Sequence, residues 1–271
     1  MGRAGTPQAG DVYRFNFPRS DLRVTVGALR LKPAFALGSW VAMKPVSGGI
    51  HGPVVMAAGD LVLTERELAP VMDRLLKGGI EITAIHHHLI RETPRLLYMH
   101  IHAVADPVDI ARQVHDAIAL TKTPPPPATP PAASTSIALD TAGIARILGQ
   151  SGRVNGGVYQ VSVARADTIH ERDMEIPPTL GLATAINFQP TGSGKAAILG
   201  DFVMRANEVD PVMRALRTNG IQATSLHSHL LNEEPRLYFM HFWANDDALK
   251  LARGLREALD KTNSKRPVAA Q

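Results

Sequence analysis

The stretch IHHHLIRETPRLLYMHIHA, residues 85–103, decides how this chain is organised. A related stretch, LHSHLLNEEPRLYFMHFWA, occupies residues 226–244 at a constant offset of 141. Extended to residues 59–103 and 200–244, the two copies align without a gap and are identical at 21 of 45 positions. A repeat of this length indicates a tandem duplication in which each copy is one folding unit.

A proline-rich segment separates the two copies. Residues 121–136 read TKTPPPPATPPAASTS, and proline cannot continue a helix or a central strand. Such a segment is typical of an extended, semi-rigid spacer. We therefore predict a first repeat over residues 1–122, a linker over 123–136 and a second repeat over 137–271.

Both copies predict the same order of secondary structure. In the first copy, residues 39–46 and 54–63 are rich in residues that favour strands, and residues 64–79 have apolar positions at helical spacing before a glycine pair. Residues 80–89 and 95–103 flank a short turn and predict a hairpin, and residues 106–120 form an amphipathic helical pattern. This order predicts an α+β fold in which each half is a mainly antiparallel sheet with helices packed on one face.

Histidines converge on one face of the predicted hairpin. Because side chains alternate along a strand, His86 and His88 share a face, and so do His100 and His102. If the turn centres near Thr93, His86 stands opposite His100, at a separation that suits ligands of one ion.

The second copy repeats this arrangement with His227, His229 and His241, and has Trp243 at the position of His102. Apolar residues share the histidine face, which favours a pocket enclosed by a second layer of strands. The opposite face, which carries Met99 and its neighbours, is predicted to form the core under the helices.

Imidazole is the commonest transition-metal ligand, and three converging histidines suit zinc with one open position. An all-histidine site also suits copper or another divalent transition metal. The pattern predicts a metal-binding protein with one site in each repeat, the ligands being His86, His88, His100 and His102 in the first and His227, His229 and His241 in the second. The alternative is a non-catalytic structural module whose histidines are hydrogen-bonded without metal.

A second functional hypothesis is a metal-dependent hydrolase acting on a phosphate ester or nucleic acid. Glu67 and Glu208 occupy equivalent helix starts, and either is a candidate catalytic residue that moves protons for metal-activated water. The competing interpretation is a capping box with Thr64, although the second copy has Arg205 at that position.

The composition narrows the remaining choices. The 271 residues include no cysteine, which excludes disulfides, thiolate metal sites and cysteine nucleophiles. A formal charge of +4 without a run of Lys and Arg gives little support for nucleic-acid binding. No apolar stretch is long enough to predict a transmembrane helix, and nothing in the sequence indicates an oligomeric state.

The chain resembles the LppY/LpqO family of bacterial exported proteins, a domain family without an assigned function. The resemblance covers nearly the whole chain and is carried by residues 2–22, 57–75, 154–165, 181–203 and 226–259. Family members commonly read His-Asn-His where this chain has His86-His87-His88 and His227-Ser228-His229, so the outer histidines match and the middle position departs. The resemblance implies an exported or periplasmic protein. The first residues have no signal-peptide core, so we expect the natural precursor to carry its export signal further upstream.

Overall fold

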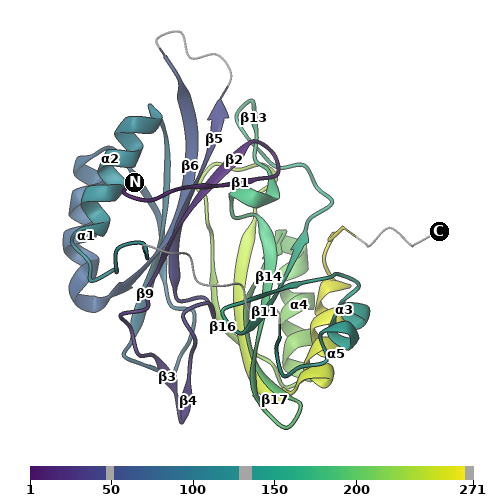
Figure 1. Cartoon of the computed structure of the whole chain (residues 1–271). Helices are drawn as coiled ribbons and strands as arrows, with labels where there is room; N and C mark the ends of the chain where they lie inside the picture. Colours follow the sequence, from purple (N-terminus) through teal and green to yellow (C-terminus); the bar gives the residue numbers. More distant parts are fainter. Residues whose placement is uncertain (47–51, 128–135, 266–271) are drawn as a thin grey trace.

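The computed structural model describes residues 1–46, 52–127 and 136–265 and contains two six-stranded antiparallel sheets, one from each repeat (Figure 1). Both sheets have the same strand order, β1-β2-β5-β6-β9-β7 in the first and β10-β11-β14-β15-β17-β16 in the second. The prediction of a duplicated α+β fold with mainly antiparallel sheets is confirmed. The strands of the first sheet are β1 (Thr6–Gln8), β2 (Val12–Pro18), β5 (Gly38–Val46), β6 (Val54–Thr64), β7 (Glu81–His86) and β9 (Leu96–Ala105). Those of the second are β10 (Arg153–Asn155), β11 (Val158–Ala164), β14 (Ala183–Gly192), β15 (Lys195–Met204), β16 (Gln222–His227) and β17 (Tyr238–Asp247).

Short strands decorate both repeats. They are β3 (Thr25–Val26), β4 (Leu29–Arg30) and β8 (Glu92–Thr93) in one three-stranded sheet, and β12 (His170–Glu171) and β13 (Met174–Glu175) in a two-stranded one. A single 3-10 turn, η1 (Pro178–Leu180), contacts β5 and β6 of the first repeat. Elements of the second repeat therefore reach the first sheet.

Helices lie on the outer side of each sheet (Figure 1), α1 (Glu65–Lys77) and α2 (Pro107–Ile118) on the first and α3 (Thr141–Leu148), α4 (Ala206–Thr218) and α5 (Ala248–Leu259) on the second. The helical spacing of the apolar residues explains the contact: Val71 of α1 and Val114 of α2 are fully buried. They join Met99 and Ile101 of β9 in one core cluster of the first repeat. The second repeat has an equivalent cluster, with Met240 and Phe242 of β17.

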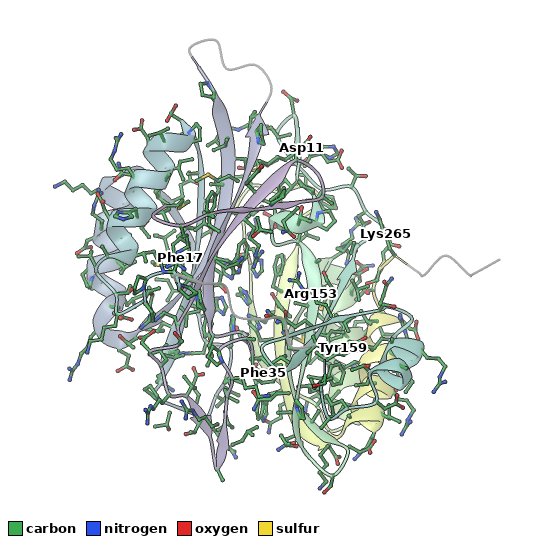
Figure 2. All side chains as sticks on the ribbon, viewed as in Figure 1. Asp11, Phe17, Phe35, Arg153, Tyr159 and Lys265 are labelled. Carbon is green, nitrogen blue, oxygen red and sulfur yellow. The ribbon has the colours of Figure 1, made fainter. Side chains whose placement is uncertain are left out.

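The inner faces of the two sheets are packed against each other. Two further clusters of buried residues draw members from both repeats, such as Ala58 with Phe239 and Tyr98 with Leu199. Figure 2 shows side chains filling the space between the sheets, and Phe35, labelled there, meets Trp243 edge to face at 6.2 Å between ring centroids. The second layer of strands that the sequence led us to expect over the histidine face is thus the sheet of the other repeat.

The central hairpin differs from the predicted one in register. Strand β7 ends at His86, and β9 begins only at Leu96, so His88 lies in the connection rather than on a strand. In the register of these strands, His86 lies opposite Tyr98 and His100 lies opposite Ala84; a register shift follows only further from the turn, between Ile82 and Ala84. The expected pairing of His86 with His100 is therefore wrong, because the residue midway between the paired positions is Glu92 and not Thr93.

Of the predicted linker 123–136, residues 128–135 lie outside the described residues. Among the described helices, none is long and apolar enough to cross a membrane.

Candidate metal centre

Six of the seven predicted histidine ligands meet between the two sheets. In the first repeat they come from the end of β7, the loop after it and the middle of β9, and in the second repeat from the equivalent places on β16 and β17. Their rings lie close together across the repeats, with centroids 3.7 Å apart for His86 and His227, 3.8 Å for His88 and His241, and 3.8 Å for His100 and His229. His86 therefore packs against its own equivalent, His227, and the contact of His88 with His241 has its counterpart in the contact of His229 with His100. This pattern is that of an approximate two-fold axis between the repeats.

Within a repeat the rings are further apart. His86 and His100 are separated by 5.0 Å, and His227 and His241 by 4.9 Å. The expectation of one separate site in each repeat needs correction, because both histidine faces point inward and the sheets stack on those faces. The result is one cluster to which both repeats contribute.

The geometry brings ligand atoms within reach of a common ion. Among the described residues, three groups have all their ligand atoms within 4.8 Å of one another. Two of them mix the repeats and one belongs to the second repeat alone: His86 with His88 and His241, His86 with His100 and His227, and Asp201 with His227 and His229.

Two buried aspartates complete the cluster. Asp60 on β6 and Asp201 on β15 are equivalent residues, and each lies opposite a histidine on the neighbouring strand. An Oδ2 atom of Asp201 lies 3.1 Å from Nε2 of His229, without hydrogen-bond geometry, and Oδ2 of Asp60 lies 3.7 Å from Nε2 of His88. Both aspartates therefore lie beside the histidines of the cluster.

The hydrogen bonds of the ring nitrogens differ between Nδ1 and Nε2. Backbone carbonyls lie near the Nδ1 atoms of several rings, Gly181 O at 3.1 Å from His229 and Gly200 O at 2.9 Å from His241. A proton on Nδ1 then leaves Nε2 with a free lone pair. The Nε2 atoms of the cluster are buried and have no hydrogen-bond partner in the described part of the chain, namely those of His86, His88, His100, His227, His229 and His241.

Burial keeps these imidazoles neutral. Desolvation, followed by the neighbouring imidazole of His229, lowers the pKa of His86 to about 3. Burial likewise lowers the pKa of His229 to about 3 and that of His241 to about 4, where the Asp201 carboxylate opposes the effect. Neutral rings are the form that binds metal.

The same burial raises the pKa values of the two aspartates. Burial, and then the negative charge of Asp201, raises the pKa of Asp60 to about 7, and burial raises the pKa of Asp201 to about 6. Burying an ionised carboxylate without a compensating charge is unfavourable. A cation at the cluster would supply that charge.

His102 does not join the cluster. Its Nδ1 lies 3.1 Å from Oε2 of Glu81, and its Nε2 lies 3.0 Å from Oε2 of Glu171, which belongs to the second repeat. The predicted ligand therefore sits between two carboxylates, and it belongs to none of the groups of ligand atoms found among the described residues. The sequence prediction failed here because Glu171 comes from the other repeat, and no spacing within the first copy places it beside His102.

The two candidate catalytic glutamates occupy helix-capping positions. Glu67 accepts hydrogen bonds from Nη1 and Nη2 of Arg19 at 2.9 and 3.0 Å, and from the backbone amides of Thr64 and Lys122 at 2.9 Å each. Glu208 accepts equivalent hydrogen bonds from Arg165 at 2.6 Å and from the backbone amides of Arg205 and Asn263 at 2.7 Å each. Within the described residues neither carboxylate has a hydrogen bond or ion pair with a histidine, so the catalytic prediction has no supporting contact.

Four further side chains that contact the histidines are absent from the predicted site residues. The rings of Tyr98 and Phe239, equivalent residues, stack on His88 and His229 at 3.3 and 3.4 Å between centroids. The hydroxyl of Thr224 donates to the carbonyl of His88 at 2.6 Å, and Thr83 does the same to His229 from the other repeat. The sequence contains a feature that could have identified them, because a threonine and an aromatic residue recur at these positions with the offset of 141.

The fold and the cluster define a duplicated α+β protein whose two sheets enclose six histidines and two aspartates. The chain belongs to the family described as Domain of Unknown Function (DUF1259), whose model matches residues 1–120 and again residues 142–261. No curated protein sequence matches the chain.

Three solved structures are similar to this chain at low sequence identity. EtuB from Clostridium kluyveri is 12% identical over 94% of this chain and 90% of that one, with a TM-score of 0.26. The trimeric bacterial microcompartment shell protein PduB is 12% identical over 96% and 91%, with a TM-score of 0.23. The double-ringed trimeric shell protein MSM0271 from the RMM microcompartment is 9% identical over 76% and 81%, with a TM-score of 0.20. TM-scores this low carry no inference about this chain.

Proposed function

We propose that this protein binds transition-metal ions, zinc or alternatively copper, through the histidine cluster between its two sheets. One observation carries the proposal: six imidazoles from two repeats converge with their Nε2 atoms buried and free of hydrogen bonds. A buried polar atom without a partner costs free energy, on the order of 1–3 kcal/mol for each atom. Coordination of one or more cations would remove the free-energy cost of burying several of these Nε2 atoms at once.

The chemistry of the ligands favours zinc or copper over a hard cation. Imidazole nitrogen suits Zn²⁺, Cu²⁺ and Ni²⁺, whereas Mg²⁺ and Ca²⁺ prefer oxygen ligands. The presence of one aspartate beside each half of the cluster is compatible with zinc, which accepts carboxylate oxygen together with imidazole. The absence of cysteine from the chain leaves nitrogen and oxygen as the strong ligands.

The hydrolase hypothesis loses its acid-base residues in this arrangement, because Glu67 and Glu208 are engaged by arginines. Metal binding is therefore the proposal, and no substrate is part of it. An exported location, which rests on the resemblance to the LppY/LpqO family alone, belongs to the same proposal.

The test is metal analysis of protein purified without a histidine tag and stripped with a chelator. We expect Zn²⁺ or Cu²⁺, added alone, to bind to the wild-type chain, and the simultaneous replacement of His86 and His227 by Ala to weaken binding at least tenfold. His115→Ala is the matched control, because this histidine is exposed on α2, and binding should be unchanged. Absence of binding by the folded wild-type protein would refute the proposal and favour a structural role for the histidines.

A further inference from the structure

We propose that the cluster holds two cations in crossed sites, each built from the His-x-His pair of one repeat and the single strand histidine of the other. The inference rests on the proposed metal-binding function and adds the number of ions and the assignment of ligands. The first site consists of Asp60, His86, His88 and His241, and the second of Asp201, His227, His229 and His100.

Two groups of converging ligand atoms can be filled at the same time. His86, His88 and His241 form one group, whereas Asp201, His227 and His229 form another, and no residue belongs to both. Each of these two groups thus offers three ligand atoms within 4.8 Å of one another.

The duplication supplies the fourth ligand on each side. Asp60 is the equivalent of Asp201 and lies beside His88, as Asp201 lies beside His229. His100 is the equivalent of His241, and its ring lies 3.8 Å from that of His229. Each site then has three imidazoles and one carboxylate, a set that fits tetrahedral zinc.

A single central ion accounts for fewer of the buried groups. The third group, His86 with His100 and His227, would occupy the middle of the cluster and use ligands from both crossed sites. It would leave the Nε2 atoms of His88, His229 and His241 buried without a partner, together with Oδ1 of Asp201 and of Asp60. Two cations engage all eight side chains and place one positive centre beside each buried carboxylate, which lowers the cost of burying both charges.

The contacts of the loop histidines decide that the sites are crossed. His88 lies against His241, with ring centroids 3.8 Å apart, and His229 lies against His100 at the same distance. The strand histidine that packs against each loop histidine therefore comes from the facing sheet. Each cation would join the two repeats, so metal binding would also stabilise their association.

Double variants separate crossed sites from sites within a repeat. In the crossed arrangement, His88→Ala with His241→Ala removes two ligands of one site, so the chain should retain one Zn²⁺ of two. His88→Ala with His100→Ala removes one ligand from each site, so both ions should be weakened and none retained at a Zn²⁺ concentration equal to that of the sites. If each repeat had its own site, the two variants would exchange these results.

The mirror pair is the internal control. His229→Ala with His100→Ala should behave like the first variant, and His229→Ala with His241→Ala like the second. Circular dichroism of the metal-free proteins establishes that each variant is folded. The reverse pattern, or equal losses in all four variants, would overturn the crossed assignment while leaving the proposed function standing.

A measurement on the unaltered chain tests the number of ions independently of folding. Wild-type protein titrated with Cu²⁺ alone should take up two ions per chain, and electron paramagnetic resonance should show magnetic coupling between them. One ion per chain with the spectrum of an isolated Cu²⁺ would overturn the two-cation inference. A folded wild-type chain that binds neither Zn²⁺ nor Cu²⁺ would instead refute the proposed function itself.

Discussion

Replacement of Glu67 by Gln tests whether this residue stabilises the fold or serves the metal centre. Its carboxylate accepts four hydrogen bonds, two of them from Arg19, whose side chain is fully buried. Arg19 also binds Asp21 at 2.9 Å and donates to the carbonyl of Val62 at 2.6 Å. Glu67 thus anchors the start of α1 to the segment after β2, and the pKa of Glu67 is lowered, since these donors outweigh the effect of burial.

The expected loss of stability follows from what remains after the change. Breaking a buried ion pair by removing one partner costs about 3–5 kcal/mol. Arg19 keeps Asp21 and the Val62 carbonyl, and glutamine keeps one acceptor oxygen, so we expect the lower end, about 3 kcal/mol. At about 2–4 °C for each kcal/mol in a chain of this size, the melting temperature should fall by about 6–12 °C.

The assay is thermal unfolding followed by circular dichroism, together with a Zn²⁺ titration of the folded protein. Glu65→Gln is the matched control, because Glu65 is exposed in the same helical turn, and its loss should cost at most about 1 kcal/mol. Zn²⁺ affinity should be unchanged in both variants. An unaltered melting temperature for Glu67→Gln, or a folded variant that has lost Zn²⁺ binding, would show that the assignment of Glu67 to structure is wrong.

Three further predictions concern the rest of the fold. Burial raises the pKa of the Glu92 carboxyl to about 7, so the folded state binds the carboxyl proton more tightly than the unfolded state does. The stability that this proton contributes is fully present below about pH 4.5 and is lost as the pH rises through about 7. Urea unfolding at pH 5 and pH 7.5 should therefore show a smaller loss of stability for Glu92→Gln than for wild type, and an identical loss would contradict the argument. Tyr98→Phe should leave the free energy of unfolding unchanged or raise it by about 1 kcal/mol, because the Tyr98 hydroxyl is buried without a partner in the described structure. The second repeat already has Phe239 at this position, and a large destabilisation of the variant in denaturant would disprove the prediction. Gly59→Ala should destabilise the folded protein by about 1–3 kcal/mol, because a Cβ atom at this position would lie 2.7 Å from the carbonyl oxygen of Trp40. An unchanged midpoint of unfolding would contradict this prediction.

Much of the fold could be predicted because its determinants are local and occur twice. The helical spacing around Val71 and the alternation around Met99 set which side chains face the core, and both appear on buried positions. The proline-rich boundary is visible without any structure. These features depend on the period of the side chains along the chain, which the order of residues specifies directly.

The position of His88 could not be predicted from side-chain alternation along a strand. Alternation along a strand placed it beside His86, and the two rings are indeed 5.2 Å apart, but β7 ends before His88 and its ring is held by loop geometry. The register of the hairpin depends on where its connection turns, which the spacing of apolar residues does not encode. His102, on the predicted face, meets Glu81 and Glu171 instead of the cluster, and Glu171 belongs to the other repeat.

The order of residues alone predicts the duplication, the antiparallel α+β class and the shared face of the histidines in each repeat. That the two histidine faces enclose one interior, in which His88 meets His241 and His229 meets His100, follows only from how the two sheets stack. The physical reason is that each sheet has a second apolar face, which is buried by stacking on the other sheet. Which residues meet across that contact depends on the relative placement of the two repeats, and no periodicity within either repeat specifies it.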